Sequence, residues 1–419
     1  MSAPARKGWC PSLFEPMESG DGLIVRLKPR AATIEAGAAR AIADAASRWG
    51  NGIVELTSRA NIQLRGARPE TVAPIAAMAM RLQLAAADPA VERIRSVMAS
   101  PLGPDDPSAD FDSHALAADI EHMLATEPGL AALPAKFGFL VDGGGALPLD
   151  GVSADIMLRS AGSEARVEIA GADAAADCSL IEAASVVRRV ALAFVVLAGR
   201  AAHPPRRMRD LARAVGAAAV FAEAGLSAAT LHHGPRSAPR AIGFVAVPGR
   251  PRGAFGIGLP YGQIEAATLA ALTDLAERHG DGTLRTTPWR ALLIAGVREN
   301  DAAPIAARAE ALSLITNAAD PRRAIAACPG KPACASATVE TRADAALLAV
   351  RGAAAPLVHV SGCAKGCAHA GSAELTLVGA NGLYNLVMNG RAGDRPVASG
   401  LSLEDALAAF TLLRSGMPR

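Results

Sequence analysis

The sequence has few aromatic residues, few cysteines and no long hydrophobic run. Aromatic side chains make up 3% of its 419 residues, too few to line a base-stacking channel for single-stranded nucleic acid. The most apolar run, Val190–Gly199, has about half the length that a membrane-spanning helix needs. Lys and Arg (42) nearly balance Asp and Glu (40), so the chain has no general electrostatic attraction to nucleic acid. We therefore predict neither a nucleic-acid partner nor a membrane partner.

The cysteine content also bounds the cellular setting. Six cysteines in a chain of this length are too sparse for a disulfide scaffold. The N-terminal segment has basic residues but no apolar stretch after them, which is unlike a secretory signal. We therefore expect a cytoplasmic protein. Hydrophobic residues reach 51%, enough for a sizeable core, and the length suggests two or three domains.

A repeat relates two distant parts of the chain. Residues 31–66 align without gaps to residues 261–296, and the identical pairs include Ile34 with Ile264 and Thr57 with Thr287. Both copies show an apolar helical stripe, a Gly-x-Gly turn and then an alternating strand pattern. Self-similarity of this kind is typical of gene duplication. We therefore predict two strand–helix–strand units related by a pseudo-twofold axis.

The two copies differ in the strand that follows the Gly-x-Gly turn. In the first copy the alternation predicts one strand over Ile53–Leu64, with Thr57, Arg59, Asn61 and Gln63 on one face. In the second copy the last three of these positions become Trp, Ala and Leu. A polar face retained in one copy and lost in the other indicates a binding site. Arg59, Asn61 and Gln63 are therefore candidate site residues.

Four of the six cysteines lie within forty residues of one another, as Cys328-x5-Cys334 and Cys363-x3-Cys367. Four thiolates suit a [4Fe–4S] cluster, a zinc ion or two disulfides. Structural zinc sites mostly use two intervening residues, and disulfides are unexpected in the cytosol. Nearby glycines would let backbone N–H groups approach inorganic sulfides. The pattern favours the [4Fe–4S] cluster and leaves the other two as alternatives.

Together, the repeat and the cysteine motifs resemble the sirohaem-dependent nitrite and sulfite reductase superfamily over nearly the whole chain. The family's cluster ligands match Cys328, Cys334, Cys363 and Cys367, and its Thr-x-Arg motif matches Thr57-Ser58-Arg59. Its arginine before an Asn-Val turn resembles Arg95, and its Leu-Pro-Arg-Lys-Phe-Lys segment resembles residues 133–138, which include Lys136. The resemblance thus adds Arg95 and Lys136 to the candidate cations.

The resemblance also implies the fold and the domain organisation. We expect an α+β chain with duplicated nitrite/sulfite reductase-like architecture. Two ferredoxin-like half-domains would span residues 10–80 and 236–300, and an α/β domain would follow each, at 85–235 and 301–419. The last of these would carry the [4Fe–4S] cysteines.

Two departures from the superfamily bear on the activity. The segment has Ala135 and Gly138 where the reductases have a further arginine and lysine. An enzyme that reduces small anions gains from each cation that binds them, so these losses argue against that activity. Leu-Pro-x-Lys-Phe-Gly-Phe, the compact length and the segment Met98–Leu102 look most like the precorrin-3B synthase family of aerobic cobalamin biosynthesis.

That family resemblance implies a reaction and its cofactors. The activity would be an O2-dependent monooxygenation of precorrin-3A at C20, with γ-lactone formation. The cofactors would be a [4Fe–4S] cluster and a mononuclear non-haem iron, whose ligands the sequence does not reveal. No dinucleotide-binding glycine motif is present, so the electrons would come from an external reductase or ferredoxin. Arg59, Arg95 and Lys136 would bind the substrate's carboxylates.

Two other functions remain as alternatives. One is a sirohaem-dependent nitrite or sulfite reductase. The other is a non-enzymatic cluster or zinc protein, which would not need the polar positions between residues 57 and 63.

Overall fold

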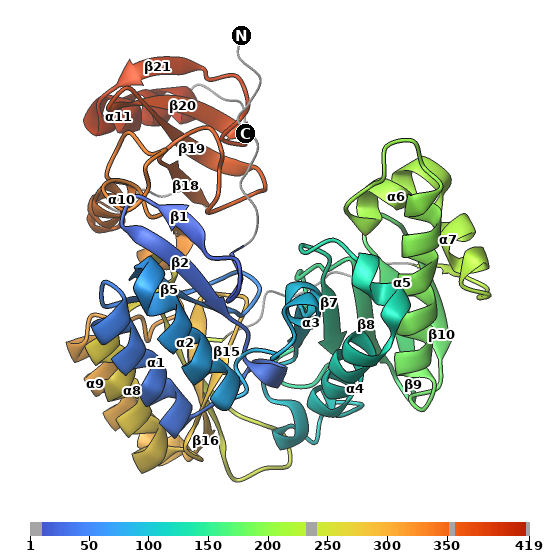
Figure 1. Cartoon of the computed structure of the whole chain (residues 1–419). Coiled ribbons are helices and arrows are strands. Elements are labelled where there is room, and N and C mark those ends of the chain that lie inside the picture. Colours follow the sequence, from blue (N-terminus) through green and yellow to red (C-terminus); the bar gives the residue numbers. More distant parts are fainter. Residues whose placement is uncertain (1–10, 232–240, 352–356, 416–419) are drawn as a thin grey trace.

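A computed structural model of the chain describes residues 11–231, 241–351 and 357–415. These residues form three five-stranded sheets and one six-stranded sheet. The two copies of the repeat lie against each other at the base of the molecule. A C-terminal lobe (red in Figure 1) and a lobe from the middle of the chain (green) rise from this base on either side. The predicted duplicated α+β architecture is confirmed.

Each copy of the repeat folds into an antiparallel sheet with helices on one face. The first copy contains β1 (Met17–Ser19), β2 (Gly22–Leu27), β3 (Thr33–Glu35), α1 (Ala36–Trp49), β4 (Ile53–Leu56), β5 (Ile62–Ala67) and α2 (Pro69–Arg81). The second contains β12 (Gly243–Val245), β13 (Gly253–Gly258), β14 (Gln263–Glu265), α8 (Ala266–His279), β15 (Thr283–Thr286), β16 (Ala291–Val297) and α9 (Ala302–Ala311). Helices α1 and α8 lie side by side (Figure 1).

The two copies exchange one strand each. β14 of the second copy completes the first sheet, whose order is β1-β2-β5-β4-β14, and aligns Ile264 with Val54. β3 of the first copy completes the second sheet, β12-β13-β16-β15-β3, and aligns Ile34 with Leu284. Both isoleucines are buried in a single hydrophobic core that holds residues of both copies. The two half-domains therefore share one core, and each sheet is completed by a strand of the other copy.

Backbone hydrogen bonds repeat this exchange at the start of each helix. Ala36 N–H, at the start of α1, donates to the carbonyl of Gly282, and Ala266 N–H, at the start of α8, donates to the carbonyl of Gly52. Both distances are 2.9 Å. Gly52 and Gly282 have φ angles of +80° and +83°, a conformation that favours glycine. The Gly-x-Gly identity between the copies thus marks a turn on which the opposite copy's helix depends.

The single strand predicted over Ile53–Leu64 is wrong, because a tight turn over residues 57–61 divides it into β4 and β5. Thr57 Oγ1 accepts the N–H groups of Arg59 (3.2 Å) and Asn61 (3.1 Å), and Ala60 has a φ angle of +56°. A side-chain acceptor that satisfies two nearby backbone donors stabilises a reversal of the chain. Arg59 therefore lies in a hairpin turn and not on a strand face.

The second copy builds the same turn. Thr287 Oγ1 accepts the N–H groups of Trp289 (3.3 Å) and Ala291 (3.2 Å), and Arg290 has a φ angle of +59°. The threonine that is identical in the two copies therefore has the same structural role in both.

The middle lobe has a mixed sheet in the order β11-β10-β9-β8-β7-β6. Helix α5 contains the most apolar run, and Val190 and Phe194 are buried in the core of the lobe. No helix in the described part of the chain is long and apolar enough to cross a membrane. The elements are α3 (Pro89–Ile94), β6 (Val97–Ala99), α4 (Ser113–Thr126), β7 (Phe139–Asp142), β8 (Ile156–Ala161), β9 (Glu164–Ile169), β10 (Ala174–Cys178), α5 (Ala183–Gly199), α6 (Met208–Val215), α7 (Ala217–Glu223) and β11 (Ala229–Thr230).

The C-terminal lobe repeats this strand pattern. Its elements are β17 (Ile325–Ala327), α10 (Thr341–Val350), β18 (Val358–Ser361), β19 (Ala373–Ala380), β20 (Leu383–Gly390), β21 (Ala398–Leu401) and α11 (Leu403–Ser415), with the strands in that order in the sheet. The first three strands are parallel and the fourth is antiparallel, as for β6, β7, β8 and β9 in the middle lobe. The duplication therefore includes the lobes.

Candidate functional site

Both cysteine motifs begin at the same edge of the C-terminal sheet. Cys328 directly follows β17, and Cys363 comes two residues after β18. β17 and β18 are parallel neighbours, so their carboxyl ends meet at one edge. The sheet thus brings together two motifs whose first cysteines are 35 positions apart in sequence.

Hydrogen bonds then join the two cysteine loops. Gly362 N–H donates to Cys328 Sγ at 3.2 Å, and Thr338 N–H donates to the carbonyl of Gly362 at 3.0 Å. Lys365 Nζ donates to Ser336 Oγ at 2.9 Å. A Cβ atom on Gly362 would lie 2.6 Å from Ala337 Cβ, so only glycine allows this close approach. The predicted C-x5-C and C-x3-C motifs therefore form one local unit.

The four cysteines of this unit are in the reduced form. In the described residues no three His, Cys, Asp or Glu side chains, these cysteines included, are grouped closely enough to hold one metal ion. A [4Fe–4S] cluster would take one thiolate at each of four iron corners, whereas zinc would need its ligands on one ion. The N–H group of Gly362 on Cys328 Sγ is a donor of the kind that tunes such clusters. The same part of the chain offers no ligand set for a separate mononuclear iron.

The first half-domain packs on the loop that carries Cys334 and donates hydrogen bonds to it. The carbonyl of Ala333 accepts Ser19 Oγ (2.6 Å), Arg65 Nη2 (2.8 Å) and Gly20 N–H (3.2 Å). A Cβ atom on Gly20 would lie 2.5 Å from the carbonyl oxygen of Pro332, so the β1–β2 hairpin packs directly on this loop. Arg65, on β5, is the central donor of this contact.

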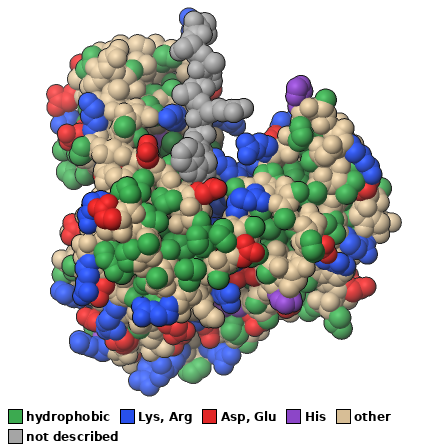
Figure 2. Space-filling view, viewed as in Figure 1, with side chains coloured by type: hydrophobic (Ala, Val, Ile, Leu, Met, Phe, Trp, Pro, Cys, Tyr) green, Lys and Arg blue, Asp and Glu red, His purple; other side chains and the backbone are tan. Residues whose placement is uncertain are grey.

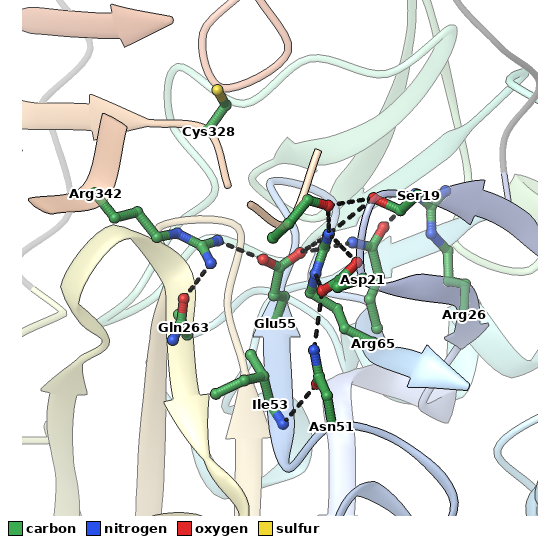
Figure 3. Close-up of polar contacts among 12 residues, drawn as sticks. Ser19, Asp21, Arg26, Asn51, Ile53, Glu55, Arg65, Gln263, Cys328 and Arg342 are labelled. Carbon is green, nitrogen blue, oxygen red and sulfur yellow. Dashed lines mark hydrogen bonds and ion pairs between the residues drawn. The ribbon is translucent and has the colours of Figure 1, made fainter. Parts of the chain in front are cut away.

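A buried ionic network surrounds Arg65 (Figure 3). The Arg65 guanidinium forms two hydrogen bonds to Asp21, at 2.8 and 2.9 Å, and lies 3.3 Å from Glu55 Oε2. Glu55 Oε1 accepts Arg342 Nη2, from α10 of the C-terminal lobe. Burial favours the neutral carboxyl, but the Arg342 and Arg65 guanidinium groups hold the pKa of Glu55 below its usual value. The network therefore joins the first half-domain to the lobe that carries the cysteines.

The network continues away from the cysteines to a pocket. Gln63 Nε2 donates to Glu55 Oε2 at 3.1 Å, and Gln63 Oε1 accepts Arg26 Nη2 at 2.7 Å. The pocket beside Arg26 is lined by Pro11, Ser12, Glu15, Arg26, Lys28, Arg59, Asn61, Arg93, Ser96 and Ala135. Two candidate residues, Arg59 and Asn61, thus meet in this pocket, and the third, Gln63, holds Arg26 at its side.

The cations that line the pocket come from two parts of the molecule, which lie on either side of a hollow. Arg26, Lys28 and Arg59 come from the first half-domain, and Arg93 comes from α3 of the middle lobe. Lys and Arg side chains gather in the hollow between the two lobes in Figure 2. The Arg93 guanidinium donates hydrogen bonds to the carbonyls of Leu133, at 2.7 Å, and Ala131, which fix its orientation. The pocket is small, and its cations suit the binding of a carboxylate group.

Sequence reasoning missed Arg26, Lys28 and Arg93. The alternation along β2 puts Arg26 on one face of the strand, and Lys28 follows two residues later, which was an available signal. Burial lowers the pKa of Lys28 to about 8, although Glu92, 3.5 Å away, opposes this shift. Lys28 therefore loses its charge closer to neutral pH than an exposed lysine does.

The other two candidate cations, Arg95 and Lys136, are not among the residues that line the pocket. Arg95 is 3% exposed, and its guanidinium contacts Glu92 (3.0 Å), Glu121 (3.2 Å) and the carbonyl of Lys28 (2.9 Å). These contacts make Arg95 a support for the pocket wall. Lys136 is half-buried, and its neighbour Ala135 lines the pocket. The structure thus places Arg95 behind the pocket wall and Lys136 directly after a residue that lines the pocket.

Comparisons with known proteins agree with this architecture. The family of nitrite/sulfite reductase ferredoxin-like half-domains matches residues 15–81 and 249–312. The solved structure of Mycobacterium tuberculosis NirA has a TM-score of 0.75 at 19% identity, over 94% of this chain and 80% of that one, and supports the fold. The fold is therefore the one found in nitrite and sulfite reductases.

Relatives found by sequence show to which family of this fold the chain belongs. A precorrin-3B synthase from a Sinorhizobium species is 33% identical over 415 residues, which cover 94% of this chain and 86% of the relative. A ferredoxin–nitrite reductase from Leptolyngbya laminosa is 25% identical, but over only 33% of this chain and 28% of its own. The chain belongs to the precorrin-3B synthase family. It is therefore an enzyme, and the nitrite and sulfite reductases are more distant relatives.

Proposed function

We propose that this chain is an O2-dependent monooxygenase of cobalamin biosynthesis, acting in the cytoplasm on precorrin-3A. The reaction would hydroxylate C20 and close a γ-lactone to give precorrin-3B. One oxygen atom of O2 would enter the substrate, and the other would leave as water after taking up two electrons and two protons. An external reductase or ferredoxin would supply the electrons.

One observation carries this proposal: a cationic pocket and the paired cysteine loops are joined by one buried hydrogen-bonded network. The link runs from Arg26 through Gln63, Glu55 and Arg65 to the carbonyl before Cys334. Precorrin-3A carries many carboxylates, and the pocket offers several cations to bind them. A simple electron carrier would need no such pocket.

Different residues of the chain would bind the substrate directly or hold the residues that bind it. Arg59, Arg93 and Lys28 would bind peripheral carboxylates, the arginines as planar forks and the lysine as a point charge. Asn61 would add a hydrogen bond at the same wall. Gln63 would fix the position of Arg26, and Arg95 would hold the backbone of Lys28. These contacts would hold the macrocycle in one orientation, which is a positioning contribution to the rate.

Cys328, Cys334, Cys363 and Cys367 would hold the [4Fe–4S] cluster, which when bound supplies one-electron chemistry. No residue is assigned to a mononuclear iron, because the described residues group no three side chains that could hold one. Lys136 stays a proposed substrate cation on family resemblance alone.

The visible spectrum of the purified protein separates the proposal from a sirohaem-dependent reductase. We expect a broad brown absorption, with iron and sulfide near four each per chain. An intense Soret-type band would favour sirohaem and the reductase. Zinc near one per chain, with no sulfide, would favour a structural metal protein.

A further inference from the structure

Arg290 is a cation beside the cysteine loops that forms no hydrogen bond or close ion pair with a carboxylate in the described part of the chain. Its Nη2 donates to the carbonyl of Ala368, directly after Cys367, at 2.7 Å. Burial and the neighbouring Arg342 guanidinium lower the pKa of Arg290, and the more weakly acting Glu55 carboxylate does not offset them. A partly buried charge is costly unless an opposite charge compensates it.

The two neighbouring arginines, unlike Arg290, form ion pairs with carboxylates. Arg65 is paired with Asp21 and Glu55, and Arg342 is paired with Glu55 (Figure 3). Three guanidinium groups thus meet two carboxylates in this region. The excess positive charge lies at Arg290, next to the cysteine loop.

The repeat shows that this arginine belongs to one copy only. Arg290 occupies the turn position that Ala60 occupies in the first copy, and both residues have positive φ angles. The first turn directs Arg59 to the pocket, whereas the second turn directs Arg290 to the cysteine loop. One duplicated turn thus carries a cation to each of the two functional regions.

We propose that Arg290 is a positioning residue that compensates the negative charge of a cluster held by the four cysteines and favours its reduced state. The inference rests on the proposed function only in requiring that the cysteines bind a [4Fe–4S] cluster. Four thiolates give such a cluster a net negative charge, and each electron accepted from an external donor adds one more. A nearby fixed cation makes that addition more favourable.

The test compares cluster content and reduction potential in purified holoprotein, with no substrate present. The variants are Arg290→Gln, which removes the charge, and Arg290→Lys, which keeps it. Arg40→Gln is the control, because Arg40 is exposed on α1 and pairs with Asp274 and Glu277 of α8. Iron and sulfide are assayed first. The midpoint potential is then measured by dithionite titration followed by electron paramagnetic resonance.

We expect Arg290→Gln to lower the equilibrium constant for one-electron reduction at least tenfold, which corresponds to about 59 mV more negative. Arg290→Lys and Arg40→Gln should stay within a threefold change. Loss of the cluster in Arg290→Gln with retention in Arg290→Lys would equally support the charge role. An intact cluster with wild-type potential in Arg290→Gln would overturn it, and so would equal cluster loss in both variants. Absence of turnover in the wild type would count against the proposed function alone, because these potentials are measured without substrate.

Discussion

Arg59 and Trp289 occupy the same position in the two copies of one turn, and they show how single residues divide the functions of the repeat. Arg59 lines the cationic pocket, whereas Trp289 packs against apolar residues of the middle lobe. The backbone around both is set by a threonine. At this position the side chain therefore decides which copy contributes a cation to the pocket.

Replacing Arg59 by Ala should mainly weaken substrate binding. A charge-assisted hydrogen bond is worth about 1.5–3 kcal/mol, so the dissociation constant for precorrin-3A should rise by roughly 10- to 160-fold. The measurement is anaerobic equilibrium binding. Arg48→Ala, at an exposed position on α1, is the control and should bind as the wild type does. An unchanged dissociation constant for Arg59→Ala would remove it from the site.

Lys28 should make binding depend on pH. Its pKa of about 8 means that the unliganded pocket loses a positive charge as the pH rises through 8, so binding of carboxylates should weaken there. Lys28→Met should lose this component of the pH profile.

The free energy of unfolding, in contrast to substrate binding, should increase as the pH rises through the same range. Between about pH 8 and 10.5 the folded chain binds fewer protons at Lys28 than the unfolded chain does, so wild-type stability gains from this group as pH rises. Identical binding profiles for the two proteins would contradict this role.

At the scale of elements, the sequence predicted the repeat because its identical residues stand where the backbone requires them. Gly52 and Gly282 have positive φ angles, and Thr57 and Thr287 organise equivalent turns. The strand over Ile53–Leu64 was predicted wrongly because alternating residues in a hairpin turn resemble a strand pattern. The spacing of the cysteine motifs predicted one site, and the structure brings their two loops together at one edge of the C-terminal sheet. The Glu55 network could not, because its partners come from three separate segments of the chain.

The two turns allow a matched prediction. Thr57→Ala and Thr287→Ala each remove an acceptor of two backbone N–H groups, so each should lower the free energy of unfolding by about 1–3 kcal/mol. Only Thr57→Ala should also weaken precorrin-3A binding, since only its turn carries Arg59. Urea denaturation and anaerobic binding measure the two effects. Equal binding losses in the two variants would show that the turns are not functionally distinct.

At the scale of the whole molecule, the reciprocal exchange of β3 and β14 makes the two half-domains one folding unit. Periodicity in the sequence predicted strands and helices but did not report which sheet a strand joins. Each exchanged strand contributes a buried isoleucine, Ile34 or Ile264, to the common core. Fully burying such a side chain stabilises the fold by about 1.5–3 kcal/mol.

Cutting the chain between residues 235 and 236 should therefore give two fragments that need each other. Co-expressed fragments should elute together as one complex in size-exclusion chromatography, because each completes a sheet of the other. Ile264→Asp in the second fragment should prevent this association by placing a charge in the shared core. Two fragments that fold and elute separately would refute the shared core.

The central claim is that a pocket of cations, joined to the cysteine loops by one buried network, binds a many-carboxylate macrocycle for oxygen insertion. One assay tests this claim most directly. Purified protein with its cluster is mixed anaerobically with precorrin-3A and an electron donor, and isotopically labelled O2 is then admitted. Mass spectrometry should find a product with a single labelled oxygen atom, and this product should be absent with Cys334→Ser. Unchanged precorrin-3A, or a product whose added oxygen comes from water, would contradict the claim.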